Sequence, residues 1–345
     1  MKVLRVLVVE DSVTVRQHLI EVLNADPGLE VVGQAGDGKE AIALCTALRP
    51  DVISMDMMLP LMTGLAATEY IMAHCPTPIL VVSASFNRGE MFRTYDAVAA
   101  GAVDMLAKPQ GHEPPGEWEA RFIAHLKLVA RVSVITHLRG RRPTTESVLA
   151  PPTRRHCELI ALGASTGGPG ALARVLSSIP APLNLPIALV MHTADPFSQA
   201  FADWLGAQTP HRVRFAVDGE PLRESRGQVV LAPPGCHLVC QAGRWQLDHG
   251  APRHSCRPSI DVLFESLARE TKAATVACLL TGMGRDGAAG LLAIQQAGGH
   301  TIAQDESTSV VYGMPREAAL LGAAQQILAL PDIGHTLAAI DRGWV

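Results

Sequence analysis

The stretch ELIALGASTGGPGAL, residues 158–172, joins an apolar run to a glycine-rich turn. The run predicts a buried strand, and a helix is expected to begin near Pro169. A nucleotide-binding P-loop requires a lysine that reaches the terminal phosphates, but here no lysine or arginine occurs before Arg174. The turn instead fits G-x-S-x-G at residues 163–167. This pattern places Ser165 on a sharp strand-to-helix turn, where its hydroxyl can be exposed as a nucleophile. A structural turn of small residues remains the alternative on this pattern alone.

Two further strands of the same half end in candidate partners for Ser165. The run LPIALVM, residues 185–191, is followed by His192, and the run ATVACLL, residues 274–280, leads through a glycine-rich turn to Asp286. The carboxyl ends of parallel strands share one edge of a sheet, so these side chains are expected to converge as nucleophile, base and orienting acid. Singly, a histidine such as His192 at a strand end more often has a structural role, and Asp286 is equally well explained as a helix cap. The order Ser, His, Asp argues against a lipase-type α/β-hydrolase, which runs Ser, Asp, His.

The N-terminal half alternates short apolar strands with helix-length segments from residue 3 to about 108, which predicts a doubly wound parallel sheet. Polar residues follow four of these strands: Glu10, Asp11, Asp56, Ser83 and Lys108. Three carboxylates at one edge repel one another unless a cation lies among them, and oxygen ligands suit magnesium. An aspartate held there can accept a phosphoryl group, with the lysine balancing its charge. Each residue taken singly is also compatible with a cap or a turn.

Composition agrees with two α/β domains. A chain of 345 residues is long for one ordinary domain, and aromatic residues make up only 4% of it. The net charge of −4 gives no reason to expect nucleic-acid binding. Seven cysteines without a C-x-x-C pair are typical of reduced thiols. No apolar run is long enough for a signal peptide or a spanning helix, so we expect a cytoplasmic protein without membrane insertion.

A helix and a linker are predicted between the two halves. The segment 117–135 has apolar residues at Trp118, Phe122, Leu126 and Val129, the spacing of a helix face packed on a sheet. After it comes a segment rich in arginine, proline and threonine with little that could form a core. Its arginines, with no interleaved aromatic residues, indicate a solvated linker rather than a nucleic-acid site. The expected division is a first domain at 1–138, a linker at 139–156 and a second domain at 157–345.

Two other features of the second half have weaker interpretations. Cysteines and histidines gather at Cys236, His237, Cys240, His254 and Cys256, but their spacing is not that of the usual zinc sites. The segment RPSIDVLF, residues 257–264, predicts a helix with its proline, at position 258, in the first turn. The arginine at position 257 is a further candidate for substrate contact.

The motifs of the first half resemble the response-regulator receiver domain over its full length. They are VVEDS (8–12), DVISMDMMLPLMTGL (51–65), VVSAS (81–85) and GAVDMLAKP (101–109). The resemblance implies a flavodoxin-like fold, a phosphoacceptor, a Mg²⁺ site and contacts to the phosphoryl group. The implied residues are Asp56 as phosphoacceptor, Glu10, Asp11, Asp56 and the Met58 carbonyl as magnesium ligands, Ser83 as switch hydroxyl and Lys108 as phosphate contact.

The first half departs from the receiver pattern at three positions. Met105 stands where receivers often carry a tyrosine or phenylalanine that moves on activation, so an aromatic switch is not expected here. Leu59 and Thr63 replace the commoner methionine and aspartate on either side of Pro60. None of the three changes alters the expected metal site.

The second half resembles the catalytic domain of the chemotaxis protein-glutamate methylesterase (CheB) family from residue 157 to about 330. The motifs include GASTGGP (163–169), MHTADPFSQAFADWL (191–205) and LLTGMGRDGAAGLLAIQQAGG (279–299). The resemblance implies a Rossmann-like three-layer α/β/α fold, a triad of Ser165, His192 and Asp286, and the Met283 N–H in the oxyanion hole. Members more often carry glutamine where Met191 precedes the histidine.

The resemblance also implies an activity and its regulation. It implies that the enzyme hydrolyses glutamate methyl esters on methyl-accepting chemoreceptors, releasing methanol, and deamidates receptor glutamines, without a cofactor for the esterase reaction. A chemotaxis histidine kinase would donate the phosphoryl group, and the unphosphorylated first domain is expected to cover the active site. Two alternatives remain at this stage: a phosphorylation-dependent adaptor with an inert esterase-like domain, and an esterase of small metabolites.

Overall fold

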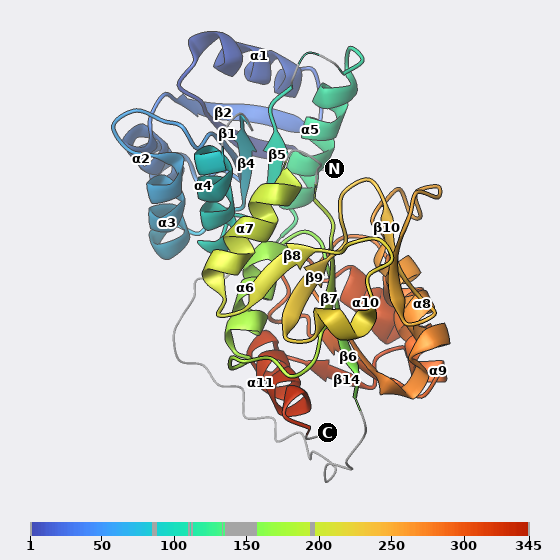
Figure 1. Cartoon of the computed structure of the whole chain (residues 1–345). Helices are drawn as coiled ribbons and strands as arrows, with labels where there is room; N and C mark the ends of the chain where they lie inside the picture. Colours follow the sequence, from blue (N-terminus) through green and yellow to red (C-terminus); the bar gives the residue numbers. More distant parts are fainter. Residues whose placement is uncertain are drawn as a thin grey trace. The chain divides into compact units, whose positions relative to one another are not determined.

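The computed structural model describes residues 2–84, 88–109, 111, 113–132, 134, 157–193 and 197–343. The chain divides into two compact units between Pro143 and Thr144 (Figure 1). The predicted linker, residues 139–156, lies outside the described residues. The exact bounds of the two domains therefore remain a prediction. Within the described residues, no helix is both long and apolar enough to cross a membrane.

The first unit contains a five-stranded sheet in the order β2-β1-β3-β4-β5, and every neighbouring pair of strands is parallel. This confirms the doubly wound sheet predicted from the sequence. Its strands are β1 (Leu4–Val9), β2 (Leu29–Ala35), β3 (Val52–Met55), β4 (Ile79–Ser83) and β5 (Asp104–Ala107). Its helices are α1 (Val13–Asn24), α2 (Gly38–Leu48), α3 (Gly64–His74), α4 (Arg88–Ala99) and α5 (Glu117–Val129).

Apolar clusters on both faces of this sheet form the core of the first unit. One cluster joins the sheet to α1 and α5, and the other joins it to α2, α3 and α4. The predicted face of α5 is confirmed, because Trp118, Phe122, Leu126 and Val129 are all buried in the first cluster. Thr63 caps α3, since its hydroxyl accepts a hydrogen bond from the Ala66 N–H at 3.3 Å.

The second unit contains a seven-stranded sheet in the order β14-β13-β12-β6-β7-β9-β8, with every pair parallel. A separate antiparallel hairpin is formed by β10 and β11. The strands are β6 (Leu159–Ala164), β7 (Ile187–Met191), β8 (Arg212–Phe215), β9 (Gln228–Leu231), β10 (His237–Gln241), β11 (Arg244–Asp248), β12 (Thr275–Leu279), β13 (His300–Gln304) and β14 (Gln326–Leu328).

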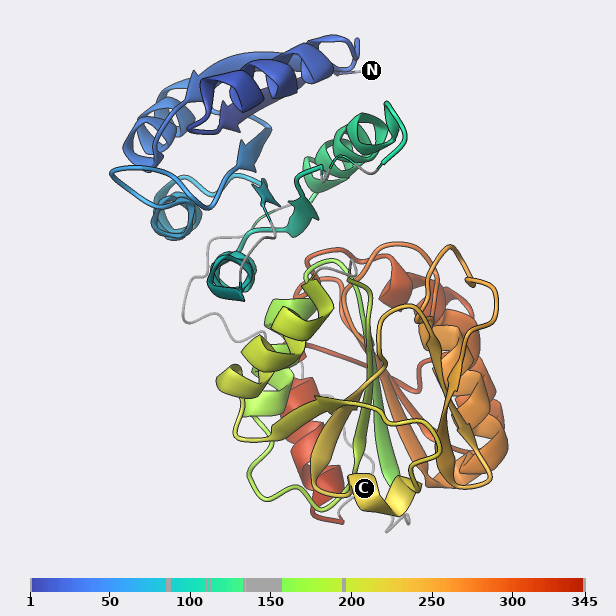
Figure 2. The same cartoon turned by 45° about the horizontal axis from the view of Figure 1, so that its top comes forward.

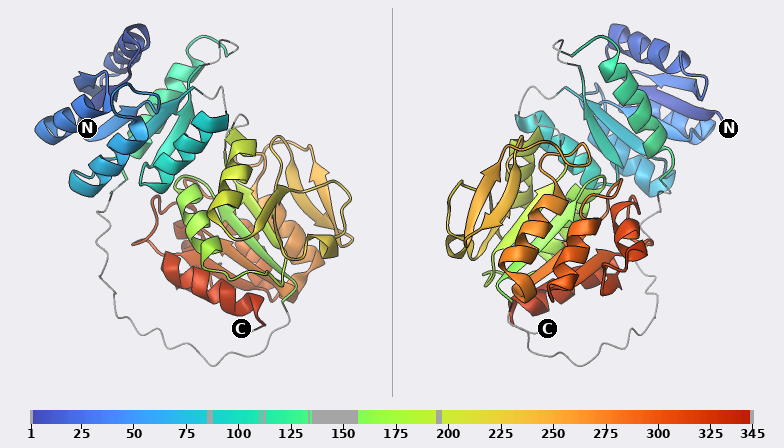
Figure 3. Two further views of the ribbon diagram at one scale, coloured as in Figure 1. Left: turned by 60° about the vertical axis from the view of Figure 1, so that its left-hand side comes forward. Right: turned by 90° about the vertical axis from the view of Figure 1, so that its right-hand side faces the viewer.

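Helices cover both faces of the seven-stranded sheet, which gives three layers (Figure 2). On one face α6 contacts α7 and α11, and on the other α8 contacts α9, as Figure 3 also shows. These helices are α6 (Gly168–Ser177), α7 (Ser198–Gln208), α8 (Ile260–Glu270), α9 (Ala288–Gln296), α10 (Met314–Leu320) and α11 (Leu330–Asp341). The predicted three-layer α/β/α fold is confirmed, and β12, β6 and β7 lie next to one another near its centre.

One local prediction was wrong. Pro258 was expected in the first turn of a helix, but α8 begins at Ile260 and its N-cap is Ser259. The reason is that the Ser259 hydroxyl accepts a hydrogen bond from the Val262 N–H at 3.4 Å, which places the cap after the proline. The Arg257–Pro258 peptide is cis and precedes the helix.

Candidate functional sites

The carboxyl edge of the five-stranded sheet holds the predicted acidic cluster. Glu10 follows β1, Asp56 follows β3 and Lys108 follows β5, so three strands bring their side chains together. The Lys108 Nζ lies 2.7 Å from Glu10 Oε2 and 2.7 Å from Asp56 Oδ2. Carboxylate oxygens of Glu10, Asp11 and Asp56 lie within 4.8 Å of one another. Glu10 and Asp56 are buried, whereas Asp11 is exposed.

Burial controls the electrostatics of this cluster. It raises the pKa of Glu10, and the nearby Asp56 charge adds to the effect, while the hydrogen bond from Lys108 opposes it. For Lys108 burial acts in the other direction, but the charges of Asp56 and Glu10 outweigh it and raise the pKa of the ammonium group. Lys108 is therefore held as a cation between two carboxylates.

The donor set at this edge fits a hard divalent cation. Clustered carboxylate oxygens are the ligands that Mg²⁺ prefers, and the Met58 backbone lies beside them, since its N–H donates to Asp56 Oδ1 at 3.3 Å. The Ser83 hydroxyl at the end of β4 is buried and has no hydrogen-bond partner among the described residues. A buried hydroxyl without a partner is costly unless a ligand supplies one, so this position suits a bound anion. Met105 is half-buried against the apolar cluster of α3 and α4.

In the second unit, Ser165 lies on the predicted turn between β6 and α6. The Ser165 N–H donates to the Thr281 carbonyl at 3.0 Å, and the Ser165 carbonyl accepts from the Gly168 N–H at 2.7 Å. Thr281 is held in turn by the Gln304 side chain, which accepts from the Thr281 N–H at 2.8 Å. Sequence reasoning missed Thr281 and Gln304, because buried polar residues of this kind carry no local signal of the turn that they support.

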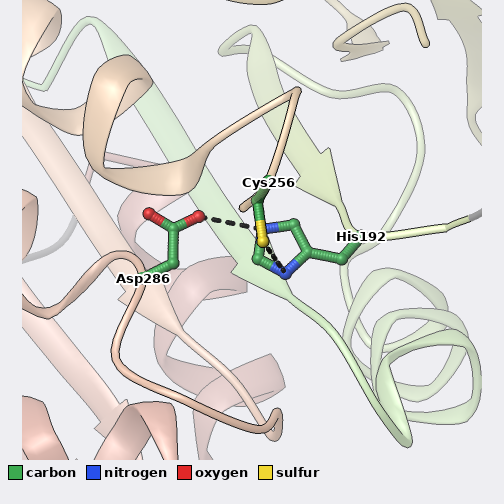
Figure 4. Close-up of side chains that lie close together, drawn as sticks. All are labelled: His192, Cys256 and Asp286. Carbon is green, nitrogen blue, oxygen red and sulfur yellow. Dashed lines mark hydrogen bonds and ion pairs between the residues drawn. The ribbon is translucent and has the colours of Figure 1, made fainter. Parts of the chain in front are cut away.

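His192 and Asp286 form a direct pair. His192 Nε2 donates to Asp286 Oδ2 at 2.8 Å, as Figure 4 shows. The other hydrogen bonds to Asp286 come from the start of α8: the Ser259 hydroxyl at 2.7 Å, the Ile260 N–H at 2.7 Å and the Asp261 N–H at 3.1 Å. Asp286 thus binds the N-terminus of α8, where a negative charge is favoured. It does not cap α9, whose N-cap is Gly287.

The pKa values of this pair move apart in the way an ion pair requires. Burial by itself would raise the pKa of Asp286, but hydrogen bonds from His192, Ser259 and the Ile260 N–H lower it. Burial by itself would lower the pKa of His192, but the hydrogen bonds to Asp286 and Cys256 raise it to about 9. Asp286 therefore stays ionised and stabilises the imidazolium form of His192.

A backbone hydrogen bond holds His192 next to the turn that carries Ser165. The His192 N–H donates to the Ala164 carbonyl at 3.1 Å, directly before Ser165. Among the described residues no hydrogen bond joins the Ser165 hydroxyl to the imidazole. The second ring nitrogen, Nδ1, instead lies 3.7 Å from Cys256 Sγ (Figure 4). The sequence did not predict this contact between Cys256 and His192, although Cys256 directly precedes the RPSIDVLF segment.

Met283 lies close to the same turn. A Cβ atom at Gly282 would lie 2.7 Å from the Ser165 Cβ, which shows how near this loop passes to the serine. Within the described residues the Met283 N–H has no hydrogen-bond acceptor, although the Gly282 carbonyl accepts from both Gly313 and Met314. A free backbone donor beside a candidate nucleophile is what an oxyanion hole needs.

The cysteines and histidines considered as a zinc site do not form one cluster, because each has different neighbours. His237 Nε2 lies 3.1 Å from the Ala251 carbonyl, and its Nδ1 accepts from the Ser259 N–H at 3.0 Å. Cys240 is buried in the apolar core. His254 pairs with Asp261, while Cys256 faces the catalytic candidate His192.

Arg257 also has a structural partner. Its Nη1 donates to the Gly250 carbonyl at 3.0 Å and to the His249 carbonyl at 3.3 Å, which fixes the loop after β11. A cavity of about 430 Å³ is lined by Cys157, Glu158 and Pro186, together with parts of residues 221–244. This cavity lies at the amino ends of β6 and β7, so it is at the opposite edge of the sheet from Ser165, His192 and Asp286.

Comparisons with known proteins agree with both halves of the chain. Residues 6–114 match the response regulator receiver domain, and residues 160–337 match the family described as CheB methylesterase. A protein of Anaeromyxobacter dehalogenans named protein-glutamate methylesterase/protein-glutamine glutaminase 2 is 44% identical over 339 residues, covering 98% of this chain and 97% of the relative. A similarly named protein of Myxococcus xanthus, number 4, is 43% identical and covers 99% of this chain and 98% of the relative.

A solved structure supports the fold of the second unit. The catalytic domain of the Thermotoga maritima CheB methylesterase is 32% identical, has a TM-score of 0.51, and covers 54% of this chain and 100% of that domain. The receiver-type sheet and the esterase-type sheet define a response regulator with an enzymatic output domain. The chain belongs to the CheB methylesterase family.

Proposed function

We propose that this chain hydrolyses glutamate methyl esters on chemoreceptors and deamidates receptor glutamines, with phosphorylation of Asp56 raising the rate. The observation that carries the proposal is the His192–Asp286 pair at 2.8 Å, at the strand edge that also presents Ser165. The names of relatives that align over nearly the whole chain support the same substrates. They also favour an enzyme over an adaptor with an inert domain. A cytoplasmic location goes with this function.

In the proposed mechanism Asp286 keeps the proton of His192 on Nε2, so the lone pair of the neutral imidazole lies on Nδ1. Nδ1 takes the proton of Ser165 as its Oγ attacks the γ-carbonyl carbon of the substrate. The same proton then leaves with methanol, or with ammonia when the substrate is glutamine. Water attacks the acyl-enzyme, again with His192 as the base, and restores Ser165.

The oxyanion formed in each step needs backbone donors. We assign one to the Met283 N–H, which has no acceptor among the described residues. A donor of this kind contributes on the order of 10²-fold or more in rate, because it stabilises charge that exists only in the transition state.

In the first unit, Asp56 is the proposed phosphoacceptor. Glu10, Asp11, Asp56 and the Met58 carbonyl would hold Mg²⁺, which neutralises charge on the incoming phosphoryl group. Lys108 already contacts Asp56 at 2.7 Å and would bind a phosphoryl oxygen, and the buried Ser83 hydroxyl would donate to another. We assign the role of phosphoryl donor to a chemotaxis histidine kinase.

The test is methanol release from membranes that carry methylated chemoreceptors, with and without magnesium and a small phosphoryl donor. Wild type should release methanol, Ser165→Ala should not, and the donor should accelerate wild type but not Asp56→Asn. No release from several receptor preparations by the phosphorylated protein would contradict the proposed substrate. Turnover of small methyl esters, together with indifference to receptor membranes, would favour the esterase of small metabolites.

A further inference from the structure

Asp261 is a buried carboxylate beside the catalytic candidates that the proposed mechanism does not use. It lies in the first turn of α8, and its side chain has no exposed surface. Its backbone N–H donates to Asp286 Oδ1 at 3.1 Å. Carboxylate oxygens of Asp261 and Asp286 and a ring nitrogen of His254 all lie within 4.8 Å of one another. Asp286, which pairs with His192, therefore has a second carboxylate next to it.

Hydrogen-bond donors on both oxygens hold the Asp261 carboxylate. Oδ1 accepts from the Gly290 N–H in α9 at 2.6 Å, and Oδ2 accepts from His254 Nε2 at 3.1 Å. Arg253 Nε lies 3.8 Å from Oδ2, while both terminal nitrogens of this guanidinium bind Glu265. A carboxylate that accepts N–H donors on both oxygens is favoured in its charged form.

His254 connects Asp261 to the loop that carries Asp286. An ionised carboxylate only accepts hydrogen bonds, so Nε2 of His254 is the donor to Asp261. The other ring nitrogen, Nδ1, accepts from Arg285 Nε at 3.4 Å. One neutral tautomer of the imidazole satisfies both contacts. Since Arg285 directly precedes Asp286 in the chain, Asp261 is fixed relative to Asp286 both through the start of α8 and through His254.

The two carboxylates act on each other through their charges. Burial raises the pKa of Asp261, the hydrogen bond from the Gly290 N–H opposes this, and the Asp286 charge adds to the increase. A second negative charge also makes a cation beside Asp286 more favourable. The cation formed there during the reaction is the His192 imidazolium, whose Nε2 lies 2.8 Å from Asp286 Oδ2.

We propose that Asp261 is a positioning residue of the esterase, which acts through Asp286 to strengthen His192 as a base. His254 holds Asp261 in the charged form that this role requires. Among the described residues, no hydrogen bond joins Asp261 to Ser165 or to the His192 ring, so its effect is electrostatic. The electrostatic effect stands independently, whereas its consequence for catalysis rests on the proposed function.

The experiment measures kcat/KM for methanol release by the full chain from acidic to alkaline pH. In Asp261→Asn the rise in kcat/KM should move to lower pH by on the order of half a unit or more, because one of two nearby negative charges is lost. The plateau at high pH should fall by about 10-fold or less, since a weaker base removes the Ser165 proton less readily. An equal loss at every pH, with the rise unmoved, would show that Asp261 only ties α8 to α9.

Asp341→Asn is the matched control. Asp341 is also buried, and its carboxylate accepts from the Asn184 and Leu185 N–H groups at 2.9 Å. These donors lie before β7, at the opposite edge of the sheet from Ser165. This variant should lose stability in thermal unfolding but keep the wild-type pH profile. A shift of the rise in Asp341→Asn equal to that in Asp261→Asn would overturn the proposal.

Variants of His254 test the same role without changing the buried carboxylate. His254→Ala removes the donor to Asp261, so the carboxyl group takes up a proton more readily and the rise should again move to lower pH. His254→Gln keeps an amide donor and should restore the wild-type profile. If Asp261→Asn does not fold, an unmoved rise in His254→Ala would overturn the proposal.

Nuclear magnetic resonance of the His192 ring supplies a readout that does not need activity, with its signals assigned by comparison with His192→Gln. The midpoint of its titration should be lower in Asp261→Asn than in wild type. If the midpoint is lower but wild type releases no methanol, the electrostatic effect stands and the proposed substrate is wrong. If methanol is released and the midpoint is the same in both proteins, the positioning role is wrong and the esterase stands.

Discussion

At the scale of single residues, Asp286 connects the catalytic pair to the framework. It accepts one hydrogen bond from His192 and three from Ser259, Ile260 and Asp261 at the start of α8. These donors lower its pKa against the effect of burial. The carboxylate therefore remains charged beside the imidazole, and it fixes both the tautomer and the orientation of the ring.

Replacing Asp286 with asparagine should reduce kcat by on the order of 10³-fold, because the amide neither stabilises the imidazolium nor enforces the Nε2–H tautomer. Methanol release at saturating receptor measures this effect. Ser259→Ala is the matched control, since it removes one hydrogen bond to Asp286 but keeps the charge, and it should cost less than about 10-fold. A comparable loss in both variants would point to collapse of the start of α8 rather than to loss of the orienting acid, and thermal unfolding would reveal it.

His192 should give the esterase an alkaline pH dependence. The base must be neutral to accept the proton of Ser165, and its pKa is raised to about 9. Most of the enzyme is then protonated at neutral pH, so kcat/KM should increase as pH rises toward 9 and level off above it. Cys256→Ser should move this rise to lower pH, because Cys256 helps to raise the pKa of His192. A wild-type profile that is already flat above neutral pH would contradict the assignment.

At the scale of secondary-structure elements, the turn after β6 works because neighbouring loops pass very close to it. A Cβ atom at Gly282 would lie 2.7 Å from the Ser165 Cβ and 2.5 Å from the Met314 Cε. Contacts this short require a shift of the neighbouring atoms. The loop that carries Met283 can therefore reach the serine only with glycine at position 282.

Gly282→Ala should reduce kcat/KM by at least about 10-fold, because displacing Ser165 or Met283 misaligns groups that act only in the right geometry. Gly206→Ala is the matched control in α7, where the added methyl group would lie 3.7 Å from its nearest neighbour. It should keep its activity, and unfolding should show slightly higher stability, by up to about 1 kcal/mol. Full activity of Gly282→Ala would remove the Gly282–Met283 loop from the proposed oxyanion hole.

At the scale of the whole molecule, the chain joins two units that each have their own sheet and core. The same division is seen in the comparisons, where the receiver and methylesterase families match separate ranges. This organisation suits a two-state regulator, in which phosphorylation of one unit changes access to the other.

A fragment of residues 157–345 should then be active without phosphorylation. Its methanol release should exceed that of the intact unphosphorylated protein and should not respond to a phosphoryl donor. Intact Asp56→Asn serves as the control, because it keeps the first unit but cannot be phosphorylated. A fragment no faster than the intact unphosphorylated protein would show that the first unit does not block the active site.

Much of the fold and the candidate sites could be predicted because the relevant signals are local. Apolar runs followed by glycine or acidic residues mark strand ends, and parallel strands bring those ends to one edge. This reasoning was sufficient to bring Glu10, Asp56 and Lys108 together in one unit, and to place His192 beside Asp286 in the other. The start of α8 was predicted too early, with Pro258 in its first turn, whereas the helix begins at Ile260 after the N-cap Ser259. A proline is compatible with both arrangements, because it is tolerated in the first turn and also before the cap.

The sequence by itself determined the two α/β units, the strand ends and the residues that they present, because hydrophobic periodicity and turn chemistry act over a few residues. Only the tertiary structure decided which polar groups meet across longer separations. Asp286 meets the start of α8, and Cys256 meets His192 although 64 residues separate them. Contacts of this kind depend on how helices pack on the sheet, and packing is a collective property of the core that no local pattern encodes.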